Sequence, residues 1–321
     1  ETYLAFKSGP NRGHFHGDQL AFHWCANARP IAVDHYCSYK PRAGQEHMHN
    51  RVAFATPELP YANMDGYERL IALGTSSVAD AAIGQVESPR LRYVTQYPPE
   101  DWDREFPQQQ LTTPLRYRRT VVLVKAEPQD YFVVRDQHDG ADVKVIYCLH
   151  VYGQRCQRRG NMIDFDDMRL LVAQPAAVEF SPFDWKHDNG GGEATKGVRL
   201  MVSGSRSQFI TVLYPRPASV VKEGLPKMEA IPGGVRVGQD EIIFAGDIDQ
   251  KPDVSCVTVR RSGEVVLTLT GNDIDLDRPQ GKIGLFVPNT GYPFGPIPDW
   301  LIRQRIGKGE SNTTVAAAAP Q

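Results

Sequence analysis

The stretch TVVLVKAEPQDYFVVRDQHDGADVKVIYCLHVY, residues 120–152, indicates the fold class most clearly. Short apolar runs alternate here with polar clusters, and no helical period of apolar residues is visible. In residues 143–150 apolar side chains at the odd positions alternate with a mixed set at the even positions, as in a strand with a core on one face. Ile146 and Cys148, at even positions, indicate that the second face is partly covered too.

The stretch itself and similar runs on both sides of it predict strands at 20–25, 30–34, 51–55, 69–74, 90–97, 120–126, 130–136, 143–152, 169–174, 197–203 and 208–215. We therefore expect an all-β protein whose main part, residues 1–217, is a large antiparallel β-sandwich. The glycine-rich segment 181–197 is predicted to be a loop.

Pro215 and Pro217 break strand pairing and indicate a linker, so a domain boundary is placed near residue 217. A smaller β domain over 218–307 follows, with a hairpin turn at 261–264. A short C-terminal helix is considered for residues 298–307, and the low-complexity tail 308–321 is predicted to be disordered.

The charge balance excludes several classes of partner. The chain of 321 residues has 36 basic and 38 acidic residues, a net charge of −2, so no broad field favours nucleic acid or an anionic membrane. The basic clusters 116–119 and 155–159 are interpreted as a solvated strand end and a turn, with binding of an anionic substrate by one of them as the alternative. No apolar run is long enough to span a bilayer. The five cysteines form no CxxC pair, and buried free thiols are expected.

Six of the nine histidines lie in GHFHGDQLAFHWCANARPIAVDHYCSYKPRAGQEHMHN, residues 13–50. His14 and His16 are two residues apart, so on a strand both imidazoles lie on one face. Asp34 ends an apolar run, where a carboxylate needs a partner or a cation. His49 precedes another predicted strand. His16, Asp34 and His49 therefore form a candidate His2Asp set for zinc, and His14, beside it, would be available as a base or hydrogen-bond donor.

Other ligands remain open, because His47, His35 and Asp18 stand close to the chosen residues in sequence. His23 lies within an apolar run and is predicted to be a buried core histidine. The H-x-H-x-D pattern also begins the metallo-β-lactamase signature, but Gln19 stands where that signature has a histidine. A cupin would require a glutamate where this chain has Leu20 and Ala21.

Three motifs together resemble one family. The patterns G-H-x-H-x-D-x-L-x-F at 13–22, R-P-x-x-x-D at 29–34 and H-N-x-V at 49–52 are similar to the C-terminal β-sandwich of the heparinase II/III-like polysaccharide lyases. The resemblance covers residues 12–215. It implies a structural zinc on His16, Asp34 and His49, with His14 beside the substrate groove.

The resemblance also implies an activity, β-elimination on a uronate-containing polysaccharide. An α/α toroid catalytic domain would then precede this chain, and the protein would be periplasmic or extracellular. Because the chain begins with Glu1 and strand-like residues follow at once, an upstream region is expected. Tyr36, Tyr39, Lys40 and Arg42 would either bind the anionic sugar or face solvent. The alternative is a metal-stabilised carbohydrate-binding or interaction module that catalyses nothing.

Overall fold

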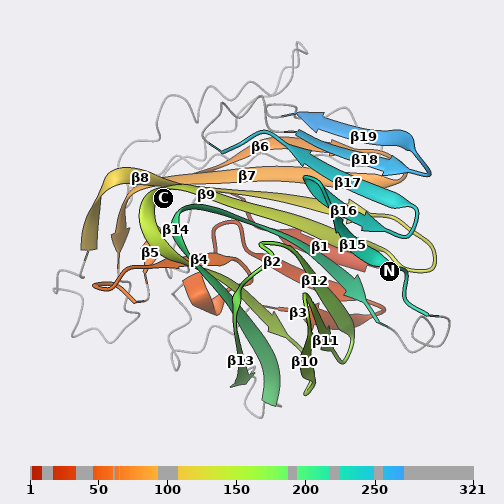
Figure 1. The fold of residues 1–321 in the computed structure, drawn as a ribbon, viewed down its shortest axis with the longest axis horizontal. Coiled ribbons are helices and arrows are strands. Elements are labelled where there is room, and N and C mark those ends of the chain that lie inside the picture. Colours follow the sequence, from red (N-terminus) through yellow and green to blue (C-terminus); the bar gives the residue numbers. More distant parts are fainter. Residues whose placement is uncertain are drawn as a thin grey trace, which may run out of the picture.

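The computed structural model describes residues 2–8, 17–33, 46–60, 62–64, 66–92, 108–186, 194–216, 224–248 and 256–270. These residues form two antiparallel sheets, of 14 and five strands (Figure 1). The first sheet comprises β1 (Thr2–Phe6), β2 (Phe22–Ala26), β3 (Arg29–Ala32), β4 (Val52–Ala55), β5 (Asn63–Met64), β6 (Tyr67–Thr75), β7 (Ala79–Arg92), β8 (Gln108–Val124), β9 (Tyr131–Val151), β10 (Cys156–Arg159), β11 (Met162–Phe165), β12 (Met168–Gln174), β13 (Glu179–Lys186) and β14 (Ala194–Pro215). The second comprises β15 (Met228–Ile231), β16 (Gly234–Val237), β17 (Asp240–Ala245), β18 (Cys256–Arg261) and β19 (Glu264–Thr270).

A 3-10 turn, η1 (Glu46–Met48), is the one helical element of the described residues, so the all-β prediction is confirmed. The αββα arrangement of the metallo-β-lactamase alternative is not the fold of these residues. No described helix is long and apolar enough to cross a membrane.

β9 and β14 are the central strands and pair along almost their whole length. They have 21 and 22 residues, whereas the sequence predicts two shorter strands in place of each. The polar segments that look like turns lie opposite each other in the sheet, with Gly204 paired to Val143 and Arg206 to Asp139 across a register shift. Gly140, at φ +123°, lets β8 pass closely, since a Cβ there would lie 2.0 Å from the carbonyl oxygen of Pro114. The chain therefore bends at this point and continues as one strand.

The side chains of β9 alternate between two cores. Phe132 and Val134 join the core enclosed by the first sheet, where the rings of Trp24 and Phe132 meet at 5.5 Å. Tyr131 and Val133 point to the opposite face and join a second core shared with β15–β19. The five-stranded sheet thus packs on the outside of the larger one, as Figure 1 shows for its teal and blue strands.

A buried polar contact also joins the two sheets. The Tyr131 hydroxyl donates to Asp240 Oδ2 at 3.0 Å, and Arg261 Nε donates to Asp240 Oδ1 at 2.7 Å. The boundary predicted near residue 217, between domains 1–217 and 218–307, remains a prediction. The hairpin turn at 261–264 is confirmed, with Ser262 and Gly263 at positive φ between β18 and β19.

Beyond the bend, the outer face of β9 is partly covered, as the sequence predicts. Ile146 and Cys148 form a small apolar cluster with Ala53 and Ala55 of β4, and Met201 of β14 packs against it. The described cysteines are free thiols as predicted, but Cys148 alone among them is buried, whereas Cys25, Cys156 and Cys256 are half-buried. Burial raises the pKa of the Cys148 thiol to about 12.

Besides the division of β9 and β14 into shorter strands, three sequence predictions are wrong. The segment 181–197 is not one loop, because β13 extends to Lys186 and β14 begins at Ala194. Phe183 of β13 packs over Gly197 of β14, where a Cβ would lie 2.2 Å from the ring, and this contact holds the two strands together. His23 is exposed, because it alternates with the buried Phe22 and Trp24 along β2.

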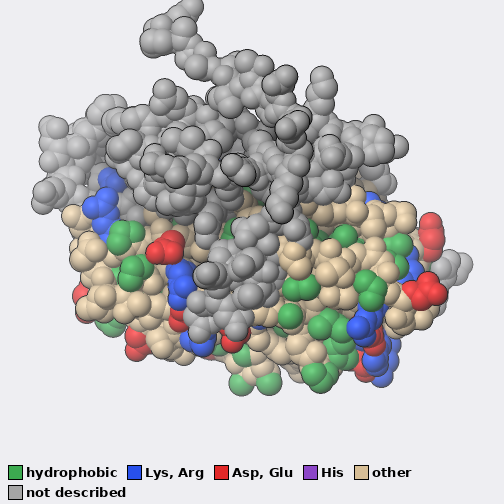
Figure 2. Space-filling model, turned by 90° about the horizontal axis from the view of Figure 1, so that it is seen from above, with side chains coloured by type: hydrophobic (Ala, Val, Ile, Leu, Met, Phe, Trp, Pro, Cys, Tyr) green, Lys and Arg blue, Asp and Glu red, His purple; other side chains and the backbone are tan. Residues whose placement is uncertain are grey.

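The third wrong prediction concerns the cluster 116–119, which is not a solvated strand end. Tyr117, Arg118 and Arg119 are all buried. On the face seen in Figure 2 the described acidic and basic side chains are interspersed, in keeping with the net charge of −2. The C-terminal helix considered for 298–307 and the tail 308–321 lie outside the described residues.

Candidate functional site

Most of the predicted site residues lie outside the part of the chain that the structure describes. These are His14, His16, Asp34, Tyr36, Tyr39, Lys40 and Arg42, together with the competing ligand His35. His49 is described and is buried, with 1% of its surface exposed. Among the described ranges no group of three or more His, Cys, Asp or Glu side chains could hold a metal. The site can therefore be examined through His49 and through the residues next to His16 and Asp34.

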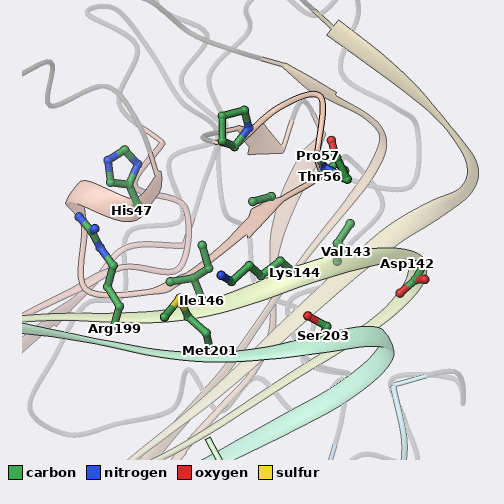
Figure 3. Close-up of a pocket in the computed structure, with 12 residues that line it drawn as sticks. His47, Thr56, Pro57, Asp142, Val143, Lys144, Ile146, Arg199, Met201 and Ser203 are labelled. Atoms are coloured by element: carbon green, nitrogen blue, oxygen red, sulfur yellow. The ribbon is translucent and has the colours of Figure 1, made fainter. Parts of the chain in front are cut away.

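His49 lies in a compact turn between η1 and β4. Its backbone N–H donates to the Glu46 carbonyl at 3.1 Å, and its own carbonyl accepts from the Arg51 N–H at 2.9 Å. His47 lies two residues before it, and in Figure 3 its ring is drawn at the same end as Arg199. The turn is stabilised by Glu46 and Arg51, whose side chains are both fully buried.

Glu46 and Arg51 form a buried ion pair, with 3.2 Å between Arg51 Nη2 and Glu46 Oε1. Glu46 Oε1 also accepts from the Met64 N–H at 2.6 Å. Burial raises the pKa of Glu46 to about 6, against the opposing effect of Arg51. Removing either partner would leave an uncompensated buried charge, so the pair fixes the turn.

The same pair holds the residue that follows His16. Arg51 Nη1 donates to the Gly17 carbonyl at 3.0 Å and to Gln19 Oε1 at 3.2 Å. Gly17 packs so closely on Glu46 that a Cβ there would lie 2.9 Å from Glu46 Cγ. The chain at residue 17 is thereby fixed against the turn that contains His49.

A second buried ion pair joins the same two segments. Arg119 Nε donates to Asp136 Oδ1 at 2.6 Å, and its Nη2 donates to Oδ2 at 3.1 Å. Arg119 Nη1 donates to the carbonyls of Leu20 and Asn50, both at 2.7 Å. The Tyr117 hydroxyl donates to Asp136 Oδ1 at 2.7 Å. A network of charged side chains in the core therefore positions residues 17–20 against residues 46–51.

The residue before Asp34 is brought to the same place by β9. The Val33 N–H donates to the His150 carbonyl at 3.2 Å, and the His150 N–H donates to Asn50 Oδ1 at 2.7 Å. Val33 precedes Asp34 and Asn50 follows His49, so the neighbours of two predicted ligands bind the backbone of one residue. With Gly17 included, the chain next to each of the three predicted ligands is held in one region.

His150 itself is a site residue that sequence reasoning did not select. Its side chain is buried, and its ring makes T-shaped contacts with the rings of Phe183 and Trp185, at centroid distances of 5.4 and 5.5 Å. The alternation of β9 correctly placed it on the outer face. Nothing local in the sequence indicated that residues 33 and 50 meet there, since those contacts span about a hundred residues.

A groove runs along the outer face of β4, β9 and β14, and we call it the β4–β9–β14 groove. It has a volume of about 520 Å³, within the range of about 300–1,000 Å³ that is typical of ligand sites. It is lined by His47, Ala55, Thr56, Pro57, Pro60, Asp142, Val143, Lys144, Ile146, Arg199, Met201 and Ser203. In Figure 3 His47 and Arg199 lie at one end and Asp142 and Ser203 at the other, with Lys144 between them. His47, two residues from His49, connects the groove to the turn.

The solved structures that resemble this chain in fold include a heparinase III and a heparan sulfate lyase. A heparinase III, the BT4657 gene product, matches with a TM-score of 0.56 and 15% identity over 84% of this chain. Heparan sulfate lyase HepC from Pedobacter heparinus matches with a TM-score of 0.52 and 14% identity, again over 84% of this chain. The fold is heparinase-like. The chain spans only 38% and 39% of the lengths of these two proteins. No family model and no curated protein matches the sequence.

Proposed function

We propose that this chain is the β-sandwich part of a polysaccharide lyase that cleaves a uronate-containing polysaccharide by β-elimination. The observation that supports the proposal most directly is the convergence of residues 17, 33 and 50. Each stands next to one residue of the predicted set His16, Asp34 and His49, and the structure holds all three in one region. The heparinase-like fold supports the same assignment.

The predicted ligand set suits zinc. Two imidazoles and one carboxylate are usual zinc donors, and His49 is buried beside an ion-paired turn. The residues next to His16 and Asp34 are held by hydrogen bonds, from the Arg51 side chain to the Gly17 carbonyl and from the Val33 N–H to the His150 carbonyl, which limits the freedom of the ligands themselves. A bound zinc would supply a structural cross-link between strand ends. In this proposal His16, Asp34 and His49 hold it, and His14 remains off the metal.

In the proposed reaction, negative charge develops on the substrate carboxyl group. β-Elimination removes the proton at C5 of the uronate and breaks the 4-O-glycosidic bond, which leaves a double bond in the product sugar. Removal of that proton develops negative charge that hydrogen-bond donors must stabilise. His14 is proposed as such a donor or as the base. Tyr36, Tyr39, Lys40 and Arg42 are proposed to bind the anionic polymer.

The remaining acid–base groups would come from a separate part of the protein. An α/α toroid preceding this chain is proposed to form the other wall of the active site. A periplasmic or extracellular location is proposed with it, because the lyases that the sequence resembles are usually exported.

The first experiment measures lyase activity with the natural upstream sequence restored. The unsaturated uronate product absorbs ultraviolet light, so cleavage can be followed directly on a uronate polymer. His14→Ala should abolish product formation while zinc content, measured by atomic emission, stays unchanged. His16→Ala should lower zinc content and thermal stability together.

Each result can contradict one assignment. Loss of zinc in His14→Ala would make His14 a ligand, and normal zinc content in His16→Ala would refute the ligand set. Zinc binding and polymer binding without any product from the longer chain would favour the non-catalytic module.

A further inference from the structure

The β4–β9–β14 groove combines an apolar floor with two basic side chains. Ile146 and Met201 lie on adjacent strands and form the floor with Ala55. Lys144 is exposed on β9, and Arg199 is half-buried on β14. A pyranose ring has apolar C–H faces and polar edges, so a floor of this kind with polar groups at its margin suits a sugar.

Arg199 and Lys144 differ from the core arginines in having no acidic partner. Arg51 and Arg119 face Glu46 and Asp136, whereas no carboxylate of the described chain pairs with Arg199 or Lys144. The Nε of Arg199 is buried and has no hydrogen-bond partner among the described residues. A buried donor without an acceptor costs free energy.

The guanidinium of Arg199 is nevertheless held in place. Its Cζ lies 4.5 Å from the centroid of the Phe183 ring. Stacking on an aromatic ring fixes the guanidinium plane and leaves its edge available to an acidic group. In Figure 3 the Lys144 side chain points along the groove toward the end where Arg199 and His47 lie. Asp142, the acidic residue of the lining, is at the opposite end.

We propose that the β4–β9–β14 groove binds one acidic unit of an anionic polysaccharide, with Arg199 and Lys144 as donors to its carboxylate or sulfate group. The apolar floor lies under the sugar ring, and Thr56 and Ser203 contact its neutral part. This inference rests on the proposed function for the kind of polymer, but not on any step of cleavage. It makes the outer face of β4, β9 and β14 a binding surface in its own right.

The test is isothermal titration calorimetry of the 321-residue chain with three tetrasaccharides. Unsulfated heparosan tetrasaccharide supplies carboxylates alone, a sulfated heparan tetrasaccharide supplies both acidic groups, and cellotetraose supplies neither. Arg199→Gln and Lys144→Gln should each weaken binding of an acidic tetrasaccharide about tenfold, the value of one hydrogen bond to a charged group. Arg199→Lys should retain more affinity than Arg199→Gln because it keeps the charge.

Arg158→Gln is the matched control. Arg158 also stacks on an aromatic ring, 5.3 Å from the centroid of Phe180, and its loss changes the net charge equally, but it lies outside the groove. It should bind like the unaltered chain, and unfolding midpoints of all variants should agree within a few degrees.

The possible outcomes separate clearly. Binding of the sulfated tetrasaccharide alone, lost in Arg199→Gln, identifies sulfate as the ligand, and equal binding of both acidic tetrasaccharides identifies the carboxylate. The inference is overturned if cellotetraose binds equally well, if Arg158→Gln has the same effect as Arg199→Gln, or if the unaltered chain binds neither acidic probe. Absence of lyase product from the longer protein would refute the proposed function without changing these binding ratios.

Discussion

Replacing Asp136 with asparagine should destabilise the protein strongly, although it changes no shape. Asp136 and Arg119 are both buried, with exposed fractions of 1% and 0%, and they share two hydrogen bonds. Asp136→Asn leaves the guanidinium charged and without a counter-charge in the core. Breaking a buried pair in this way costs about 3–5 kcal/mol, a large part of the usual stability of a protein domain.

The same two strands provide a matched control. Arg116 of β8 and Asp139 of β9 also form an ion pair, but their side chains are 29% and 22% exposed. Asp139→Asn should cost about 0–1 kcal/mol because solvent screens both charges. Urea denaturation at neutral pH, monitored by tryptophan fluorescence, measures both free energies of unfolding.

The reasoning fails if Asp136→Asn destabilises the protein no more than Asp139→Asn does. A further check uses the carbonyls of Leu20 and Asn50, which Arg119 binds. Hydrogen exchange in residues 17–26 and 46–55 should accelerate in Asp136→Asn and remain unchanged in Asp139→Asn.

Three further predictions concern the sheets. Burial lowers the pKa of His138 in the folded state, so that on acidification the unfolded chain takes up a proton on this residue before the folded protein does. The free energy of unfolding should therefore fall as the pH drops below about 6.5, the usual pKa of histidine. Urea denaturation at pH 7.5 and 5.5 should show a smaller fall in His138→Gln than in the unaltered protein. Gly197→Ala should lower the free energy of unfolding by about 1–3 kcal/mol, because the new methyl group pushes the Phe183 ring away. In a double-mutant cycle the same substitution should cost less in a Phe183→Leu background, and additive effects would contradict the contact. Burial raises the pKa of the Cys148 thiol to about 12, so a thiol reagent at pH 8 should leave Cys148 unmodified until the protein unfolds. Cys25 is half-buried and should be modified in the native protein. Rapid modification of Cys148 in the native protein would be inconsistent with its burial.

The local pattern of the sequence predicts the parts of the fold that depend on local alternation. The odd and even positions of 143–150 face different surroundings in the structure, as the sequence indicates. The pattern fails at Gly140 and Gly204, because polar glycine-containing segments normally form turns. Here they lie opposite each other across two long strands, and that register is a property of the pair.

The candidate site was predictable only in part for a similar reason. His49 was selected from its spacing, and its burial is compatible with the predicted role. The residues that position it, Arg51 and Arg119, are arginines, which are normally solvated, and Arg119 belongs to the basic cluster 116–119. Arg119 reaches the carbonyl of Leu20, 99 residues earlier, and no local pattern can indicate such a contact.

The core shared by the two sheets has a practical consequence for shortening the protein. A truncation after residue 217 would remove β15–β19 and uncover Val133, Ile210 and Val212 together with their neighbours on the first sheet. Such a continuous apolar surface favours association in water. A protein ending there is expected to aggregate unless these positions are replaced with polar residues, even though the predicted metal set and the groove lie on the retained part.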